Sequence, residues 1–222
     1  MAASDELAKV TRGVQERLRN ARPPMPRKAS DLYVAISKCL LRASNDRFIK
    51  DGPHDVQRKL KLIRDKNTPD TIAITGGLVD GTRFGKKDPF ERDDGALFDF
   101  SISIRQQAEV VELLAYDFLI ELPPGLGPPL LRFDLNLPGQ DNEHIGLRSH
   151  VHPGVDEDQL IVPAPVMAPV EILTIFLHHL RRAARERNVR GRFQWDPDVP
   201  SGYGDLQRRA FRLMSWIKLS GG

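Results

Sequence analysis

The sequence predicts an α+β fold, in which an antiparallel β-sheet of four to five strands is covered by a long helix and preceded by an all-helical N-terminal region. Three observations lead to this prediction. Apolar residues recur at helical spacing in residues 1–67, they alternate with polar residues from residue 96 onward, and an amphipathic stretch follows Pro169. The chain has 222 residues, of which 40% are hydrophobic and 28% charged, so it can bury a sizeable core.

Residues 1–67 are predicted to form a basic region of helices. Ser4 and Ser30 occupy expected N-cap positions, and Pro53 suits the first turn of a helix PHDVQRKLKLIRD. Residues 68–95 are rich in glycine and charged residues and are predicted to be a loop. This loop lacks the Gly-Lys-Ser/Thr ending of a phosphate-binding loop, which disfavours nucleotide binding there.

Residues 96–190 are predicted to hold the sheet and its covering helix. ALFDFSISIR and LLRFDLNL alternate strictly, whereas VVELLAYDFLIEL is longer and more continuously apolar, as central strands are. HIGLRSHVH is the fourth predicted strand, and LIVPAPVM follows it. PVEILTIFLHHLRRAARER, which begins at Pro169, predicts the covering helix. Residues 191–222 are predicted to be a basic C-terminal extension with an amphipathic helix, DLQRRAFRLMSWIKL.

The net formal charge of +3 is unevenly divided along the chain. Residues 1–67 carry +8, residues 68–180 carry −11 and residues 181–222 carry +6. Two basic ends suit RNA or another nucleic acid as a partner, or an acidic protein. The alternative is that the ends dock on the acidic middle of the same chain or of a second copy. The amphipathic C-terminal helix also suits a protein partner or a homo-oligomer.

Cys39 is the only cysteine, so the chain cannot form an internal disulfide and a reducing compartment is expected. Its apolar neighbours favour a buried small side chain over a nucleophile. The N-terminus does not resemble a signal peptide, and no apolar run reaches the roughly 18 residues of a membrane helix. We therefore expect a cytoplasmic protein with no membrane partner and no cofactor.

Two predicted neighbouring strands carry the candidate site. Arg132 and Asp134 occupy the polar positions of one strand, and Arg148, His150 and His152 occupy those of the next, so all five are expected on one face. Histidines move protons near neutral pH, arginines stabilise the charge of a phosphate, and an aspartate can orient an imidazole. This combination predicts metal-independent cleavage of RNA.

Three pieces of this region resemble the TumE-like toxins of bacterial toxin–antitoxin modules, namely RFDLN at 132–136, His144 and HVH at 150–152. The likeness covers residues 97–185, which is under half of the chain. It implies an RNA-cleaving toxin fold with the candidate residues Arg132, Asp134, His144, His150 and His152. The chain departs from the pattern in two places, because Leu135 stands where an asparagine is expected and Ser149 stands where a histidine is expected. About a hundred further residues also precede the sheet.

Other interpretations of the same residues remain open. A metal ion could be held by His150 and His152, with His144 or Asp134 as a third ligand. Alternating polar residues on a solvent-exposed sheet face need no chemical role at all. The arginine run that begins after residue 180 adds candidate phosphate ligands, although a solvated helix end explains the same charges. These candidates are Arg181, Arg182 and Arg185.

Two classes of function therefore stand side by side. The first is a small cytoplasmic ribonuclease of a bacterial toxin or defence system, with His150, His152, His144 and Asp134 as catalytic residues. The second is a non-catalytic module that binds nucleic acid or protein through its basic helical ends, with the sheet as scaffold. The enzyme requires the histidine face of the sheet to be open, so N-terminal helices packed on that face would exclude it.

Overall fold

The computed structural model describes residues 23, 25–64, 68, 70–79, 87–108, 110–125, 128–140, 148–154 and 161–180. Its strands form one eight-stranded sheet in which every pair is antiparallel. The strands are β1 (Leu60–Arg64), β2 (Thr71–Gly76), β3 (Phe90–Glu91), β4 (Leu97–Gln107), β5 (Val110–Glu121), β6 (Leu130–Leu135), β7 (Ser149–Pro153) and β8 (Val162–Pro163). Their order across the sheet is β1-β2-β4-β5-β6-β7-β8, and β3 pairs with β4.

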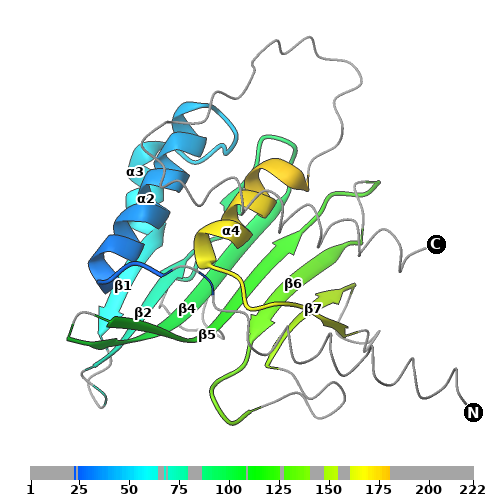
Figure 1. Ribbon diagram of the computed structural model, residues 1–222. Helices are drawn as coiled ribbons and strands as arrows, with labels where there is room; N and C mark the ends of the chain where they lie inside the picture. Colours follow the sequence, from blue (N-terminus) through cyan, green and yellow to red (C-terminus); the bar gives the residue numbers. More distant parts are fainter. Residues whose placement is uncertain are drawn as a thin grey trace, which may run out of the picture.

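The described helices are α2 (Ala29–Asn45), α3 (Pro53–Lys59) and α4 (Pro169–Thr174), and α4 continues into the short π-helix η2 (Ile175–His179). Helices α2 and α4 lie over the same face of the sheet, with α3 beside α2 (Figure 1). The alternation of apolar residues along the strands explains this layer, because the side chains of every second residue point to one face. The ring of Phe176 on η2 lies 5.7 Å from that of Phe133, 6.1 Å from Phe98 and 6.2 Å from Phe118.

Within the described residues, the structure contradicts the predicted fold class in three respects. There the sheet has eight strands rather than four to five, the N-terminal region is not all-helical, and no long helix covers the sheet. The four strands that the sequence predicted from residue 96 onward correspond to β4, β5, β6 and β7. The additional strands are β1, β2, β3 and β8, of which β2 and β3 fall in the segment 68–95 that was predicted to be a loop.

The predicted helix PHDVQRKLKLIRD ends early and turns into strand β1. Leu60 follows α3 with extended backbone angles, φ −87° and ψ 122°. From there the chain pairs with β2, residue by residue from Leu60 opposite Gly76 to Arg64 opposite Ile72. In this strand Ile63 is exposed. Backbone pairing with the neighbouring TIAITG segment outweighs the helical spacing of the apolar residues.

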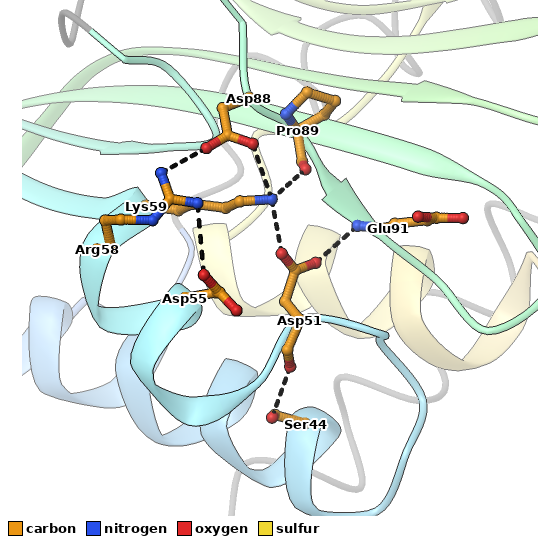
Figure 2. Close-up of polar contacts among 8 residues, drawn as sticks. All are labelled: Ser44, Asp51, Asp55, Arg58, Lys59, Asp88, Pro89 and Glu91. Carbon is orange, nitrogen blue, oxygen red and sulfur yellow. Dashed lines mark hydrogen bonds and ion pairs between the residues drawn. The ribbon is translucent and has the colours of Figure 1, made fainter.

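A buried lysine fixes this junction between α3 and β1 (Figure 2). The Nζ of Lys59 lies 2.6 Å from Asp51 Oδ1 and 3.1 Å from Asp88 Oδ1, and it donates to the carbonyl of Pro89 at 2.6 Å. Asp51 also accepts the backbone N–H of Glu91 at 2.8 Å. Buried charges need paired and hydrogen-bonded surroundings, which these groups supply. The cluster therefore holds α3 and β1 against β3.

Arg92 explains why the predicted covering helix is not a continuous α-helix. Its side chain is fully buried and donates to the carbonyls of Phe176 and Leu180, the latter at 2.6 Å, while it pairs with Asp94. The N–H of Leu180 bonds to the carbonyl of Ile175, five residues back, at 3.1 Å. In a regular α-helix the N–H of Leu180 would bond to the carbonyl of Phe176, four residues back. Because the Arg92 guanidinium already donates to that carbonyl, the helix takes the wider π form at this point. Residues 181–222 lie outside the described part of the chain.

The remaining structural predictions have separate outcomes. Helix α2 is present, although it begins at Ala29 and no side chain caps it, and Pro53 stands at the first turn of α3 as predicted. Cys39 packs against the core although part of its surface is exposed, and burial raises the pKa of its thiol to about 12. The predicted helix around Ser4 and the C-terminal helix in 191–222 lie outside the described residues. Within the described part, no helix is both long and apolar enough to cross a membrane.

Candidate functional site

The site lies on β6 and β7, on the face opposite α4. Arg132 pairs with His152 and Asp134 pairs with His150 in the antiparallel register of the two strands. Phe133, between the two polar residues of β6, points to the apolar face and meets Phe176. Alternation and register together thus bring four polar side chains onto one patch, and the predicted placement of these residues is confirmed.

One carboxylate oxygen is the centre of this patch. Asp134 Oδ2 accepts a hydrogen bond from Arg132 Nε at 2.8 Å. The same oxygen lies 3.4 Å from His152 Nε2 and 3.5 Å from His150 Nε2. The two imidazole rings meet edge to face, with their centroids 4.8 Å apart. We call these four residues the Asp134 cluster.

The members of the Asp134 cluster differ in exposure. The side chains of His150 and Asp134 are 4% and 9% exposed, whereas those of His152 and Arg132 are 16% and 17% exposed. His152 and Arg132 therefore form the outer edge of the cluster.

Asp134 is held in its ionised form. Burial acts to raise the pKa of this carboxyl, but the contacts with His150 and His152 and the charge of Arg132 outweigh burial and hold the pKa well below its usual range. The second oxygen, Asp134 Oδ1, is buried and has no hydrogen-bond partner. Buried polar atoms are satisfied in the large majority of cases, so this oxygen is unusual.

Arg148 stands directly before β7, and its side chain contacts the backbone of neighbouring segments. Its guanidinium donates to the backbone carbonyls of Asn136, at 2.8 Å, and Leu114, at 2.5 Å. Its own carbonyl lies 3.3 Å from Nδ1 of His150, so both ring nitrogens of His150 face oxygen atoms. Arg148 thus connects the start of β7 with Asn136, which follows β6, and with Leu114 on β5. Its predicted role in binding the substrate phosphate stays a prediction.

The other predicted site residues fall outside the described part of the chain. They are His144, Arg181, Arg182 and Arg185. Their predicted roles in catalysis and phosphate binding therefore stay predictions.

Two carboxylates on this face received no role from the sequence. Asp117 on β5 stands directly opposite Asp134 on β6, and Asp99 on β4 lies in the cross-strand row that leads through Leu119 to Arg132. Burial raises the pKa of Asp99, although Lys87 Nζ lies 3.1 Å from its carboxylate. Both carboxylates occupy polar positions of alternating strands, which is the signal that could have found them.

The described helices leave the face of the Asp134 cluster uncovered. Helices α2 and α4 pack on the apolar face, where residues of both belong to the core (Figure 1). The condition that would have excluded an enzyme, N-terminal helices on the histidine face, is therefore not met by α2 or α3.

Comparison with known sequence families, with curated proteins and with solved structures finds no match for this chain. Its function must therefore be inferred from its own residues.

The Asp134 cluster can do two things chemically. A carboxylate that orients imidazoles beside an arginine suits proton transfer next to a phosphate. The cluster also suits a metal ion, because it offers three ligand atoms that lie within 4.8 Å of one another. They come from Asp134, His150 and His152.

Proposed function

We propose that the protein is a metal-independent ribonuclease of a bacterial toxin or defence system, which cleaves RNA in the cytoplasm on the face of the Asp134 cluster. One observation carries this proposal. A single ionised carboxylate contacts two imidazoles and a guanidinium on a sheet face that the described helices leave uncovered. The resemblance of RFDLN and HVH to TumE-like toxins favours the same reaction and supports the same residues.

The exposed fractions of the four side chains support the following division of roles. His152, at the outer edge, accepts the proton of the RNA 2′-hydroxyl, and Asp134 holds the ring by its Nε2. Arg132, which pairs with His152 across the two strands, binds the phosphate and stabilises the charge that develops on it. We assign the return of a proton to the leaving 5′-oxygen to His150, the second imidazole, whose ring centroid lies 4.8 Å from that of His152.

The reaction needs no oxidant and no ion. The 2′-oxygen, whose proton passes to His152, attacks the phosphorus and forms a 2′,3′-cyclic phosphate. The bond to the 5′-oxygen breaks, and a proton from His150 goes to the leaving 5′-oxygen. General acid–base catalysis by a positioned side chain contributes about 10²–10⁴-fold to such a rate. Loss of His152 is expected to lower the rate by this factor.

The test is cleavage of a mixed-sequence, single-stranded RNA in EDTA by protein without a histidine tag. We expect wild type to cleave and His152→Ala to lose about 10²–10⁴-fold in rate. His54→Ala is the matched control, because His54 is exposed on α3 and far in sequence from the cluster. Equal cleavage by wild type and His152→Ala would refute the assignment. RNA that is bound in low salt but never cut would instead establish the alternative, a non-catalytic binding module.

A further inference from the structure

Three atoms of the Asp134 cluster have the spacing of ligands around one small ion. Asp134 Oδ2 lies 3.4 Å from His152 Nε2 and 3.5 Å from His150 Nε2. Zinc binds imidazole nitrogen and carboxylate oxygen at about 2.1 Å, and two ligands at tetrahedral positions around it are then about 3.4 Å apart. Both separations agree with this value, and all three ligand atoms lie within 4.8 Å of one another. Two imidazoles with one carboxylate are also a donor set that first-row transition metals prefer.

A second observation concerns the same carboxylate. Asp134 is buried, and its Oδ1 has no hydrogen-bond partner. A buried carboxylate normally has donors on both oxygens, because an unmatched buried acceptor loses the hydration that it had in water. An ion at the carboxylate would compensate the charge of both oxygens. The protein groups contact Oδ2 and leave Oδ1 without a partner.

Arg132 opposes the ion and sets how tightly it binds. Its Nε donates to Asp134 Oδ2, the oxygen that also faces both imidazoles. A guanidinium at this distance repels a second cation and competes for the same oxygen. The site is therefore expected to be reversible, and removal of the Arg132 charge should strengthen it.

We propose that Asp134, His150 and His152 form a binding site for a divalent transition-metal ion of the zinc class, and that the bound ion switches the ribonuclease off. The metal site stands on the geometry alone, whereas its inhibitory role rests on the proposed function. An imidazole that gives its Nε2 lone pair to a metal keeps a hydrogen on Nδ1, so it cannot accept a proton there. Metal binding and proton transfer by His152 therefore exclude each other.

The experiment measures metal binding and RNA cleavage separately on the full-length, tag-free chain. Zn²⁺ alone is titrated by calorimetry and by competition with a zinc-sensitive dye. We expect about one strongly bound ion per chain, and His152→Ala should weaken its binding by more than about 100-fold, since loss of even an outer-shell partner costs about 10–100-fold. His54→Ala should bind as wild type does. Zn²⁺ binding that is equal in wild type and His152→Ala would show surface binding only and overturn the site.

Arg132→Gln gives a result that misfolding cannot imitate. We expect this variant to bind Zn²⁺ more tightly than wild type and to cleave RNA more slowly in EDTA, because the same guanidinium repels the ion and binds the phosphate. Weaker or unchanged Zn²⁺ binding by folded Arg132→Gln, judged by its unfolding transition, would contradict the geometry described for the ion.

The cleavage assay with added Zn²⁺ separates the two proposals. Cleavage in EDTA that stops when Zn²⁺ reaches the occupancy measured by titration supports both. Cleavage without cluster-dependent Zn²⁺ binding overturns the metal site and leaves the ribonuclease intact. Cluster-dependent binding without cleavage under any condition overturns the ribonuclease and the inhibitory role but leaves the site. Cleavage that requires Zn²⁺ overturns the inhibitory role and the metal-independent mechanism together.

Discussion

Arg92→Met should be among the most destabilising single substitutions in the sheet domain. It keeps an unbranched apolar stem but removes the donors that serve the carbonyls of Phe176 and Leu180, and it leaves Asp94 without its buried partner. An unsatisfied buried carbonyl costs about 1–3 kcal/mol, and breaking a fully buried ion pair costs about 3–5 kcal/mol. The side chain of Asp94 is 22% exposed and can be partly hydrated, so we expect a total of about 3–4 kcal/mol.

Urea unfolding and thermal unfolding measure this loss directly. At about 2–4 °C per kcal/mol for a chain of this size, the Tm should fall by about 6–16 °C. Arg42→Met is the matched control, because Arg42 is 59% exposed and pairs with Asp46 only one helical turn away. Such a surface pair contributes no more than about 0.5 kcal/mol. If Arg92→Met cost no more than Arg42→Met, the claim that Arg92 anchors η2 would be wrong.

Three further predictions follow from buried groups. Gly76→Ala should destabilise by about 1–3 kcal/mol in urea unfolding, because its Cβ would lie 2.3 Å from Cζ of the fully buried Phe100. Asp99→Asn should raise the Tm near neutral pH. Burial raises the pKa of Asp99 in the folded state, so the ionised carboxylate costs stability there, and the gain should vanish below the usual pKa of about 3.9. Cys39 should resist alkylation at pH 8 in the native protein and react in urea, since its thiol has a pKa of about 12 only when folded.

The strands that carry the site were predictable because alternation is a local property of the sequence. RFDL and SHVH each place polar residues at every second position, and an antiparallel pair then puts those residues on one face. The sequence could not supply the register. Only the pairing of Arg132 with His152 and of Asp134 with His150 shows that one carboxylate meets three partners.

Two errors in the fold, at β1 and at the helix after Pro169, have one physical origin, because contacts between residues distant in sequence decided the outcome. The segment LKLIR has helical spacing, yet it becomes β1 because β2 lies beside it. The apolar stretch that begins at Pro169 has the periodicity of an α-helix, yet Arg92, more than 80 residues earlier, takes one of its carbonyls. TIAIT does alternate, and its two isoleucines and two threonines favour a strand. That signal was local and was obscured by the glycine-rich segment that follows it.

The cost of the Asp134 cluster is itself an argument for a chemical role. Bringing a carboxylate and a guanidinium out of water is expensive, and buried ion pairs can often be replaced by apolar residues without loss of stability. A sheet face that served only as scaffold would gain nothing from an ionised Asp134 with an unpartnered Oδ1. The partners of Oδ2 compensate part of the free-energy cost of burying the carboxylate, and the part that belongs to Oδ1 is not compensated. A phosphate placed at Arg132 and His152, or a cation placed at the carboxylate, is the kind of ligand that makes such an arrangement useful.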